Sequence, residues 1–184
     1  MWNIWKEKAN LQILIWGTII GGLISALVKW GGEVIMPARI AGEISPPGAH
    51  INAWLGWTGF NQHSLDYVYQ GSNILGAVSI YHVLFSVVFT FLYVFVSAYC
   101  PKIRALYGAV YGLIVTVFAH GLMIPIFGLR YPVYNPGHVG WLWNLNGYEL
   151  WSEIIGHILW GISIEICLIA ILAYFAKPIK GSWA

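Results

Sequence analysis

Charged residues are scarce in this chain. Asp, Glu, Lys and Arg make up only 9% of its 184 residues, whereas 59% are hydrophobic. Soluble domains carry about a quarter charged residues, so this chain has too few charges to cover a surface that faces water. We therefore predict an integral membrane protein that forms a single membrane domain over residues 1–184.

Net charge, cysteine and catalytic motifs are also sparse. The net charge is only +2 and is scattered along the sequence, which disfavours a nucleic-acid partner. The two cysteines, Cys100 and Cys167, form no CxxC pattern and indicate neither a disulfide framework nor a zinc ribbon. Since no nucleophile motif, phosphate loop or dinucleotide fingerprint is present, hydrolase and kinase chemistry is disfavoured and a protein that is not an enzyme is favoured.

Long hydrophobic runs are what the chain has instead. Four of them approach or exceed the length of about 20 apolar residues that crosses a bilayer as a helix. They cover approximately residues 11–28, 74–98, 106–127 and 154–175. The sequence thus predicts an all-α protein with four transmembrane helices. The short segment Cys100 to Arg104 is expected to be a tight turn that makes the second and third spans an antiparallel hairpin.

The distribution of Lys and Arg predicts the orientation in the membrane, because cytoplasmic loops carry an excess of these residues. Six flank the two termini and the tight turn, and three lie on the other side: Lys6, Lys8, Lys102, Arg104, Lys177 and Lys180 against Lys29, Arg39 and Arg130. Both termini are therefore expected in the cytoplasm.

The two long connectors, at about 31–73 and 128–147, are then expected to face outward. Both are rich in the aromatic residues that gather where membrane meets water. These are Trp54, Trp57, Tyr67 and Tyr69 in the first connector, and Tyr131, Tyr134, Trp141 and Trp143 in the second.

Small residues recur at a spacing of four on two spans. Gly17 and Gly21 lie on the first span, and Gly108 and Gly112 lie at the start of the third. This spacing allows helices to approach closely in lipid. Besides the bilayer itself, the partner of these faces is expected to be a helix of the same chain, with a homo-oligomer as the alternative.

Ionisable residues inside the spans are the strongest pointer to function. His82, His120 and His157 each lie in a different span, and Glu165 lies with His157 in the last. Such groups are costly in hydrocarbon and usually face the interior of a bundle or a cavity. At a rise of 1.5 Å per residue, His82 and His120 fall ~5–6 Å outward of the midplane, His157 lies at ~11 Å and Glu165 is near the midplane.

Further ionisable residues are expected near the outer mouth of the spans. Glu153 shares a helix face with His157, which is four residues later. Lys29 and Glu33 lie at the outer end of the first span. Because the predicted inner halves of the spans hold no Asp, Glu, Lys, Arg or His, the series indicates a cavity that opens outward and ends near the midplane.

The favoured function is that this cavity binds or exchanges protons or a small polar solute. Histidine suits that role because it titrates near neutral pH. The predicted site consists of His82, His120, His157, Glu153 and Glu165, with Lys29 and Glu33 at the mouth.

Two other interpretations use the same residues. Imidazole and carboxylate groups from facing helices could hold a metal ion through His82, His120, His157 and Glu153, or His82 and His120 could hold a b-type haem. A third alternative is a non-enzymatic structural or interaction subunit, in which the buried His and Glu side chains only fix the packing of the helices.

At these residues the chain resembles the YagU-like family of bacterial inner-membrane proteins, whose function is uncharacterised. The resemblance rests on segments spread over nearly the whole chain, namely 28–33 with Pro37 and Arg39, 82–86, 101–103, His120, 152–157 with Trp160, and 164–166. It implies a multi-pass protein of the bacterial inner membrane with a loose association with acid tolerance. The first connector and the short, weakly charged termini depart from the family pattern.

Overall fold

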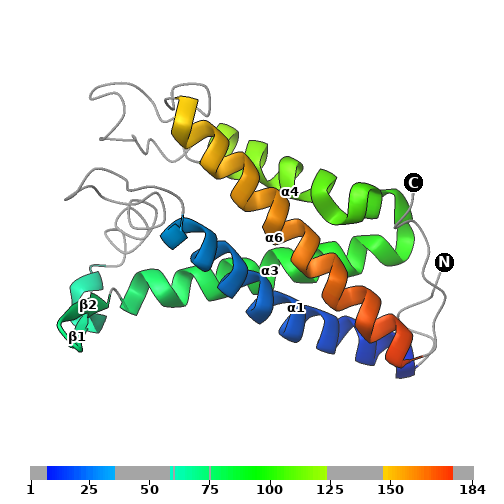
Figure 1. Ribbon diagram of the computed structural model, residues 1–184. Helices are drawn as coiled ribbons and strands as arrows, with labels where there is room; N and C mark the ends of the chain where they lie inside the picture. Colours follow the sequence, from blue (N-terminus) through cyan, green and yellow to red (C-terminus); the bar gives the residue numbers. More distant parts are fainter. Residues whose placement is uncertain (1–7, 36–58, 60, 75, 124–146, 176–184) are drawn as a thin grey trace. The chain divides into compact units, whose positions relative to one another are not determined.

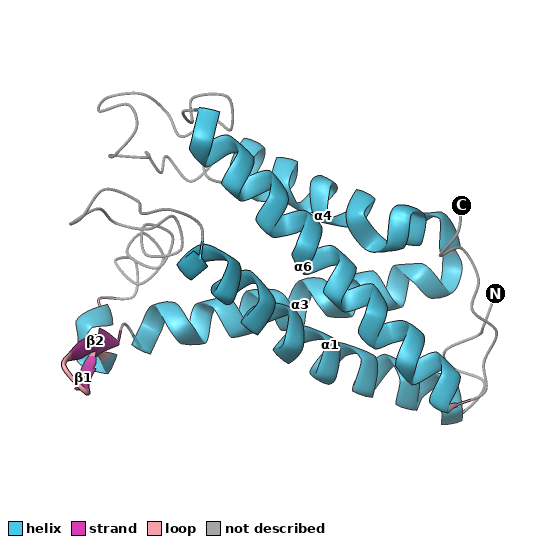
Figure 2. Cartoon of the chain, viewed as in Figure 1, coloured by secondary structure: helices cyan, strands magenta, loops and turns pink. Residues whose placement is uncertain are grey.

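The chain contains four helical segments that are long and apolar enough to cross a membrane. The computed structural model describes residues 8–35, 59, 61–74, 76–123 and 147–175, and the four candidate spans within them are Lys8–Gly32, Ser79–Tyr99, Pro101–Met123 and Leu150–Tyr174. Helix is the expected form, because in hydrocarbon each backbone N–H and C=O must find its partner within the protein. The prediction of four membrane-spanning helices is confirmed (Figures 1 and 2).

Three of the spans belong to regular α-helices. These are α1 (Lys8–Ile35), α3 (Gly76–Tyr99) and α6 (Gly147–Tyr174). Helix α6 begins at Gly147 rather than at the predicted Ile154, because the helix continues past the apolar run into a polar flank. This extension brings Glu153 into the same continuous helix as His157 and Glu165.

The third span differs from the single straight helix that the sequence predicts. It starts with the 3-10 helix η2 (Pro101–Gly108), continues as α4 (Ala109–Thr116) and ends as the π-helical segment η3 (Val117–Met123). Leu106, Tyr107 and Gly108 have φ values of 51°, 55° and 83°, in the left-handed region. The chain therefore turns sharply immediately after Arg104, which lies within η2.

The described helices fall into two compact units. Unit 1 comprises Met1–Pro37, Phe85–Thr116 and Trp151–Ala184, and unit 2 comprises Ala38–Leu84 and Val117–Leu150. Unit 1 has an apolar core to which α1, α3, α4 and α6 all contribute. Its buried members are Ile13, Leu14, Tyr93, Val94, Ala98, Tyr111, Val115, Trp160, Ile164, Leu168, Ile171 and Leu172.

The helices of unit 1 approach one another through glycines. Gly17 lies against the Val94 side chain of α3 and Gly21 lies against Thr90, so α1 and α3 are antiparallel. Gly112 of α4 lies directly on the backbone carbonyl of His157 in α6. The predicted close approach of small residues thus occurs between helices of the same chain.

Unit 2 contains a small β-hairpin just before α3. Strands β1 (Tyr67–Tyr69) and β2 (Ser72–Ile74) pair antiparallel, with Tyr67 opposite Ile74. Gln70 and Gly71, between them, have φ values of 49° and 78°, as a two-residue type I′ hairpin requires. A 3-10 turn, η1 (Gln62–Leu65), precedes the hairpin.

Most of the predicted aromatic connectors lie outside the described residues. The exceptions are Tyr67 and Tyr69 of β1, which are both exposed. Trp54, Trp57 and the four aromatic residues of the second connector are among those outside, and the outward position of the connectors stays a prediction.

The contact between α4 and α6 predicts a strong effect of one methyl group. A Cβ at residue 112 would overlap the His157 carbonyl and lie 2.8 Å from its carbon, so Gly112→Ala should lower the free energy of unfolding by about 1–3 kcal/mol. Gly31→Ala is the matched control, because nothing lies within 4 Å of a Cβ there. The free energy of unfolding of each variant is measured by SDS titration of the purified protein, with tryptophan fluorescence as the readout. Equal effects of the two substitutions would contradict the close approach.

Candidate functional site

Unit 1 buries an unusual number of polar side chains in its apolar core. They are Asn10, Ser25, Ser86, Thr90, Ser97, Arg104, Thr116, Glu153, His157, Ser163 and Glu165. Three groups of contacts account for the ionisable ones and their neighbours. We call Lys29, Glu153 and His157 the lysine cluster, Ser25, Ser86 and Trp160 the serine layer, and Tyr93, Arg104 and Glu165 the arginine cluster.

The lysine cluster joins α1 to α6 by a nearly buried ion pair. Lys29 Nζ lies 3.2 Å from Glu153 Oε2, and the two side chains are 12% and 7% exposed. Gly156, on the next turn of α6, makes room for the lysine, because a Cβ there would be 3.4 Å from Nζ and 3.6 Å from Cδ. The ammonium group therefore lies against the backbone of α6, where it neutralises the Glu153 carboxylate.

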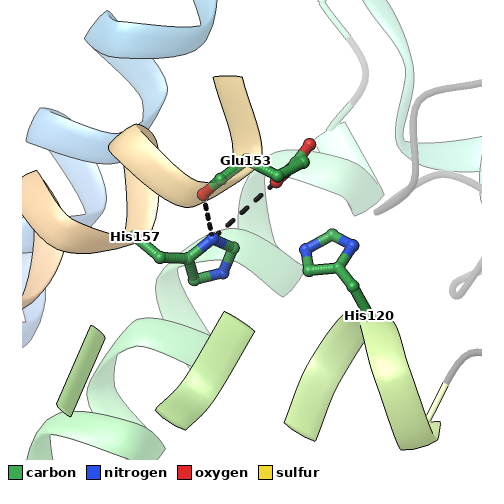
Figure 3. Close-up of side chains that lie close together, drawn as sticks. All are labelled: His120, Glu153 and His157. Carbon is green, nitrogen blue, oxygen red and sulfur yellow. Dashed lines mark hydrogen bonds and ion pairs between the residues drawn. The ribbon is translucent and has the colours of Figure 1, made fainter. Parts of the chain in front are cut away.

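His157 is held by the same glutamate. Its Nδ1 lies 2.8 Å from the backbone carbonyl oxygen of Glu153 and 3.8 Å from the carboxylate oxygen Oε2, as Figure 3 shows with dashed lines. A carbonyl oxygen only accepts hydrogen bonds, so Nδ1 carries a hydrogen. In the neutral ring the lone pair is then on Nε2, which is the atom that can take up a proton.

The serine layer lies next along α6 and ties three helices together. Trp160 Nε1 donates to Ser86 Oγ at 2.8 Å, and Ser86 and Ser25 lie 2.7 Å apart through their hydroxyl oxygens. Ser25 Oγ in turn donates to the backbone carbonyl of Gly22 at 3.2 Å. Because Ser25 gives its only hydroxyl hydrogen to the Gly22 carbonyl, Ser86 must be the donor in its contact with Ser25, and the direction of the whole chain is fixed.

Trp160 also connects the serine layer to its aromatic neighbours. Its ring stacks on Tyr111 of α4 at a centroid distance of 5.8 Å, and the His157 ring meets it edge-on at 6.3 Å. The indole is only 2% exposed. His157 is thus in contact with a tryptophan that is buried among the helices of unit 1.

The arginine cluster is the most completely buried group. Arg104 Nη2 donates to Glu165 Oε1 at 2.7 Å, and Nε lies 3.0 Å from each carboxylate oxygen. The Tyr93 hydroxyl donates to Oε2 at 2.8 Å. All three side chains are at most 1% exposed.

The pairing of Arg104 with Glu165 was not predicted from the sequence. Arg104 was expected in a turn, because the apolar run begins at Leu106. The structure instead folds that turn so that the guanidinium reaches into the core. The available signal was the carboxylate itself, since a Glu within a span normally has a cationic or hydrogen-bonding partner.

The remaining predicted site residues belong to unit 2 or lie outside the described part. His82 and His120 both belong to unit 2, where His120, the third side chain labelled in Figure 3, is 5% exposed and His82 is half-buried. Their predicted match in depth stays a prediction. The Glu33 side chain lies outside what the structure describes, although its backbone belongs to α1.

The family of the chain follows from a comparison with known proteins. The model of a family described as "Protein of unknown function (DUF1440)" matches residues 23–166, a range that contains every residue of the two ionic clusters. The chain belongs to this family. The match covers α3 and η2 completely, most of α6 and the C-terminal part of α1.

A curated relative supplies the location. The chain is 33% identical over 172 residues to the inner membrane protein YagU of Escherichia coli (strain K12). The aligned region covers 80% of this chain and 78% of the relative. This confirms the resemblance inferred from the sequence. No solved structure matches the chain. With four apolar spans, it is a multi-pass protein of the inner membrane.

The lysine cluster predicts a strong coupling between its two charges. Each single variant, Lys29→Met or Glu153→Gln, leaves an uncompensated buried charge. Each should therefore lower the free energy of unfolding by about 3 kcal/mol. The double variant should recover most of that loss, because no lone charge remains. SDS titration of the four proteins gives the coupling energy. Lys8→Met, at an exposed position of the same helix, is the control and should stay within about 0.5 kcal/mol. Additive losses in the cycle would show that the pair carries no coupling.

Proposed function

We propose that this protein binds and exchanges protons at His157, within the lysine cluster. The observation that carries the proposal is the buried contact of the imidazole with Glu153, whose carboxylate is already balanced by Lys29. A histidine in such a place is one of the few side chains that changes charge near neutral pH.

The geometry supports a simple exchange. A proton enters at Nε2, while Nδ1 keeps its hydrogen bond to the Glu153 carbonyl. The new positive charge lies close to the carboxylate, whose nearer oxygen is 3.8 Å from Nδ1. The ring can therefore be charged or neutral without any change in the helix backbone, which favours reversible binding over a purely structural role.

The serine layer supports exchange with one side of the membrane. Its members carry no group that titrates near neutral pH, and its hydrogen bonds end at the Gly22 carbonyl. A proton bound at His157 has no side-chain route through this layer toward the arginine cluster, so it leaves by the way it entered.

We further propose that this side is the outside of the cell. Arg104 and Lys29 are engaged in buried ion pairs, so neither reports on membrane orientation. The remaining Lys and Arg residues still divide five to two in favour of cytoplasmic termini. The lysine cluster then faces outward, where it would exchange protons or a small polar solute with the outside. A role in acid tolerance would suit a site that follows external pH.

Titration of His157 should be visible through its neighbour Trp160. A charged imidazole quenches an indole in ring contact, so tryptophan fluorescence of the purified protein should change reversibly between about pH 5 and 8. His157→Gln should remove that component of the change. His63→Gln is the control, because His63 is exposed and pairs with Asp66 in unit 2. If the two variants titrate alike, or if His157→Gln alters only stability, His157 is a packing residue.

The native cysteines test the orientation. Cys100 is exposed at the turn between α3 and η2, whereas Cys167 is buried. We expect a membrane-impermeant maleimide to label Cys100 in inside-out vesicles and not in intact spheroplasts. Cys100→Ser should abolish labelling, since Cys167 is shielded in the core. Labelling from the outer face would place the termini outside and reverse the direction of the site.

A metal ion is the second candidate. His120, Glu153 and His157 offer nitrogen and oxygen atoms of the kinds that hold a metal ion, although the Lys29 ammonium already neutralises Glu153. Elemental analysis and an absorption spectrum of protein purified without added metal decide between the two. About one equivalent of metal that is lost in His120→Ala, or a haem Soret band, would favour this candidate over proton exchange.

A further inference from the structure

The arginine cluster contains a receptor for a carboxylate, occupied by the carboxylate of Glu165. We propose that it is a second binding site, which takes a small monovalent carboxylate in place of Glu165 when Glu165 binds a proton. The proposal does not depend on the lysine cluster, because it involves different residues and a different ligand.

The first support is the convergence of donors on one planar group. Two guanidinium nitrogens of Arg104 and the Tyr93 hydroxyl make four contacts of 2.7–3.0 Å to the two oxygens of Glu165. A guanidinium fork matches a carboxylate in this way, which is why Arg predominates where carboxylates are recognised. The donors come from α3 and η2, so they would remain in place if the acceptor from α6 were replaced.

The second support is the cost of the arrangement. A buried ion pair is often no more stabilising than apolar side chains of similar volume, because both charges lose their hydration. Here the backbone adds a further cost, since Leu106 and Tyr107 adopt left-handed conformations at about 1–3 kcal/mol each. The pair therefore carries a cost in stability, and a costly ionisable group at this depth indicates a site.

Protonation of Glu165 makes the exchange electrically balanced. The neutral acid no longer compensates Arg104, so an entering anion restores the pairing, and one proton and one anion bind together. The charged or titratable groups that face Glu165 are Tyr93 from α3 and Arg104 from η2. Within the described helices, α1 has no ionisable side chain between Lys8 and Lys29, and α4 has only Tyr111, whose hydroxyl donates to the Phe89 carbonyl.

The surroundings restrict the ligand. A single guanidinium balances one negative charge, so a monovalent anion fits and a dianion such as hydrogen phosphate does not. The space is small, because the Gly108 backbone lies on the Gly161 carbonyl, and a Cβ at residue 108 would be 3.2 Å from the Glu165 Cβ. Lys102 is exposed in η2 and would attract anions to this end of the bundle.

Formate binding to the purified full-length protein tests the proposal. The readout is a saturable rise in melting temperature and the heat of binding, with sodium chloride at equal ionic strength as the control. Glu165→Gln mimics the protonated acid, so it should bind formate about tenfold more tightly than the wild type at neutral pH. Wild-type affinity should rise as the pH is lowered, over a range in which formate is still an anion.

Variants of the donors complete the design. Arg104→Gln, alone or with Glu165→Gln, should abolish saturable binding, and Tyr93→Phe should weaken it. Binding by the double variant that equals binding by Glu165→Gln, or no saturable binding by a folded Glu165→Gln variant, would overturn the proposal. If a variant fails to fold, the wild-type measurements at different pH values test the proposal. An affinity for formate that does not rise as the pH falls would overturn it. His157→Gln should bind formate normally, so failure of this site and failure of the proton site are separable.

Discussion

Neutralisation of the two carboxylates on α6 is the constraint on which the rest of unit 1 depends. Glu153 and Glu165 are both buried in α6, and each must receive a cation from another element. Lys29 supplies one from α1 and Arg104 supplies the other from η2. The two pairs are about 18 Å apart along α6, so they link α6 to α1 and to η2 at two separate levels of unit 1.

Glycine contacts make these ion pairs geometrically accessible. Gly112 and Gly161 bring α4 and the end of η2 onto the α6 backbone, and Gly156 admits the lysine side chain. Association in lipid gains little from apolar burial and relies on close packing and hydrogen bonds. The serine layer adds such bonds between α1, α3 and α6. Packing and polar pairing therefore support each other, and neither would position His157 alone.

The sequence predicted features that depend on length and local spacing. Four apolar runs predicted four spans, and the spacing of four between Glu153 and His157 predicted their common face, where the structure shows them in contact. Arg104 and the serine layer were not predictable in this way. Arg104 reaches Glu165 only because Leu106 and Tyr107 are left-handed, and residues of their types rarely adopt that conformation. Ser25 and Ser86 meet only through the relative rotation of two helices, which hydropathy does not specify.

The contacts of α1 differ in stiffness along its length. At Gly17, Gly21 and Gly22 its backbone lies directly on neighbouring side chains, with the Val87 Cα only 2.8 Å from a Cβ built on Gly22. Beyond Lys29, Gly31 has no such neighbour within 4 Å, and the connection to α6 is the long aliphatic stem of the lysine. A lysine side chain can change rotamer while its ammonium stays on Glu153. This end of α1 can therefore shift slightly against α6 while the Lys29–Glu153 ion pair is kept. The flexible contact lies next to His157, which is bonded to the same glutamate.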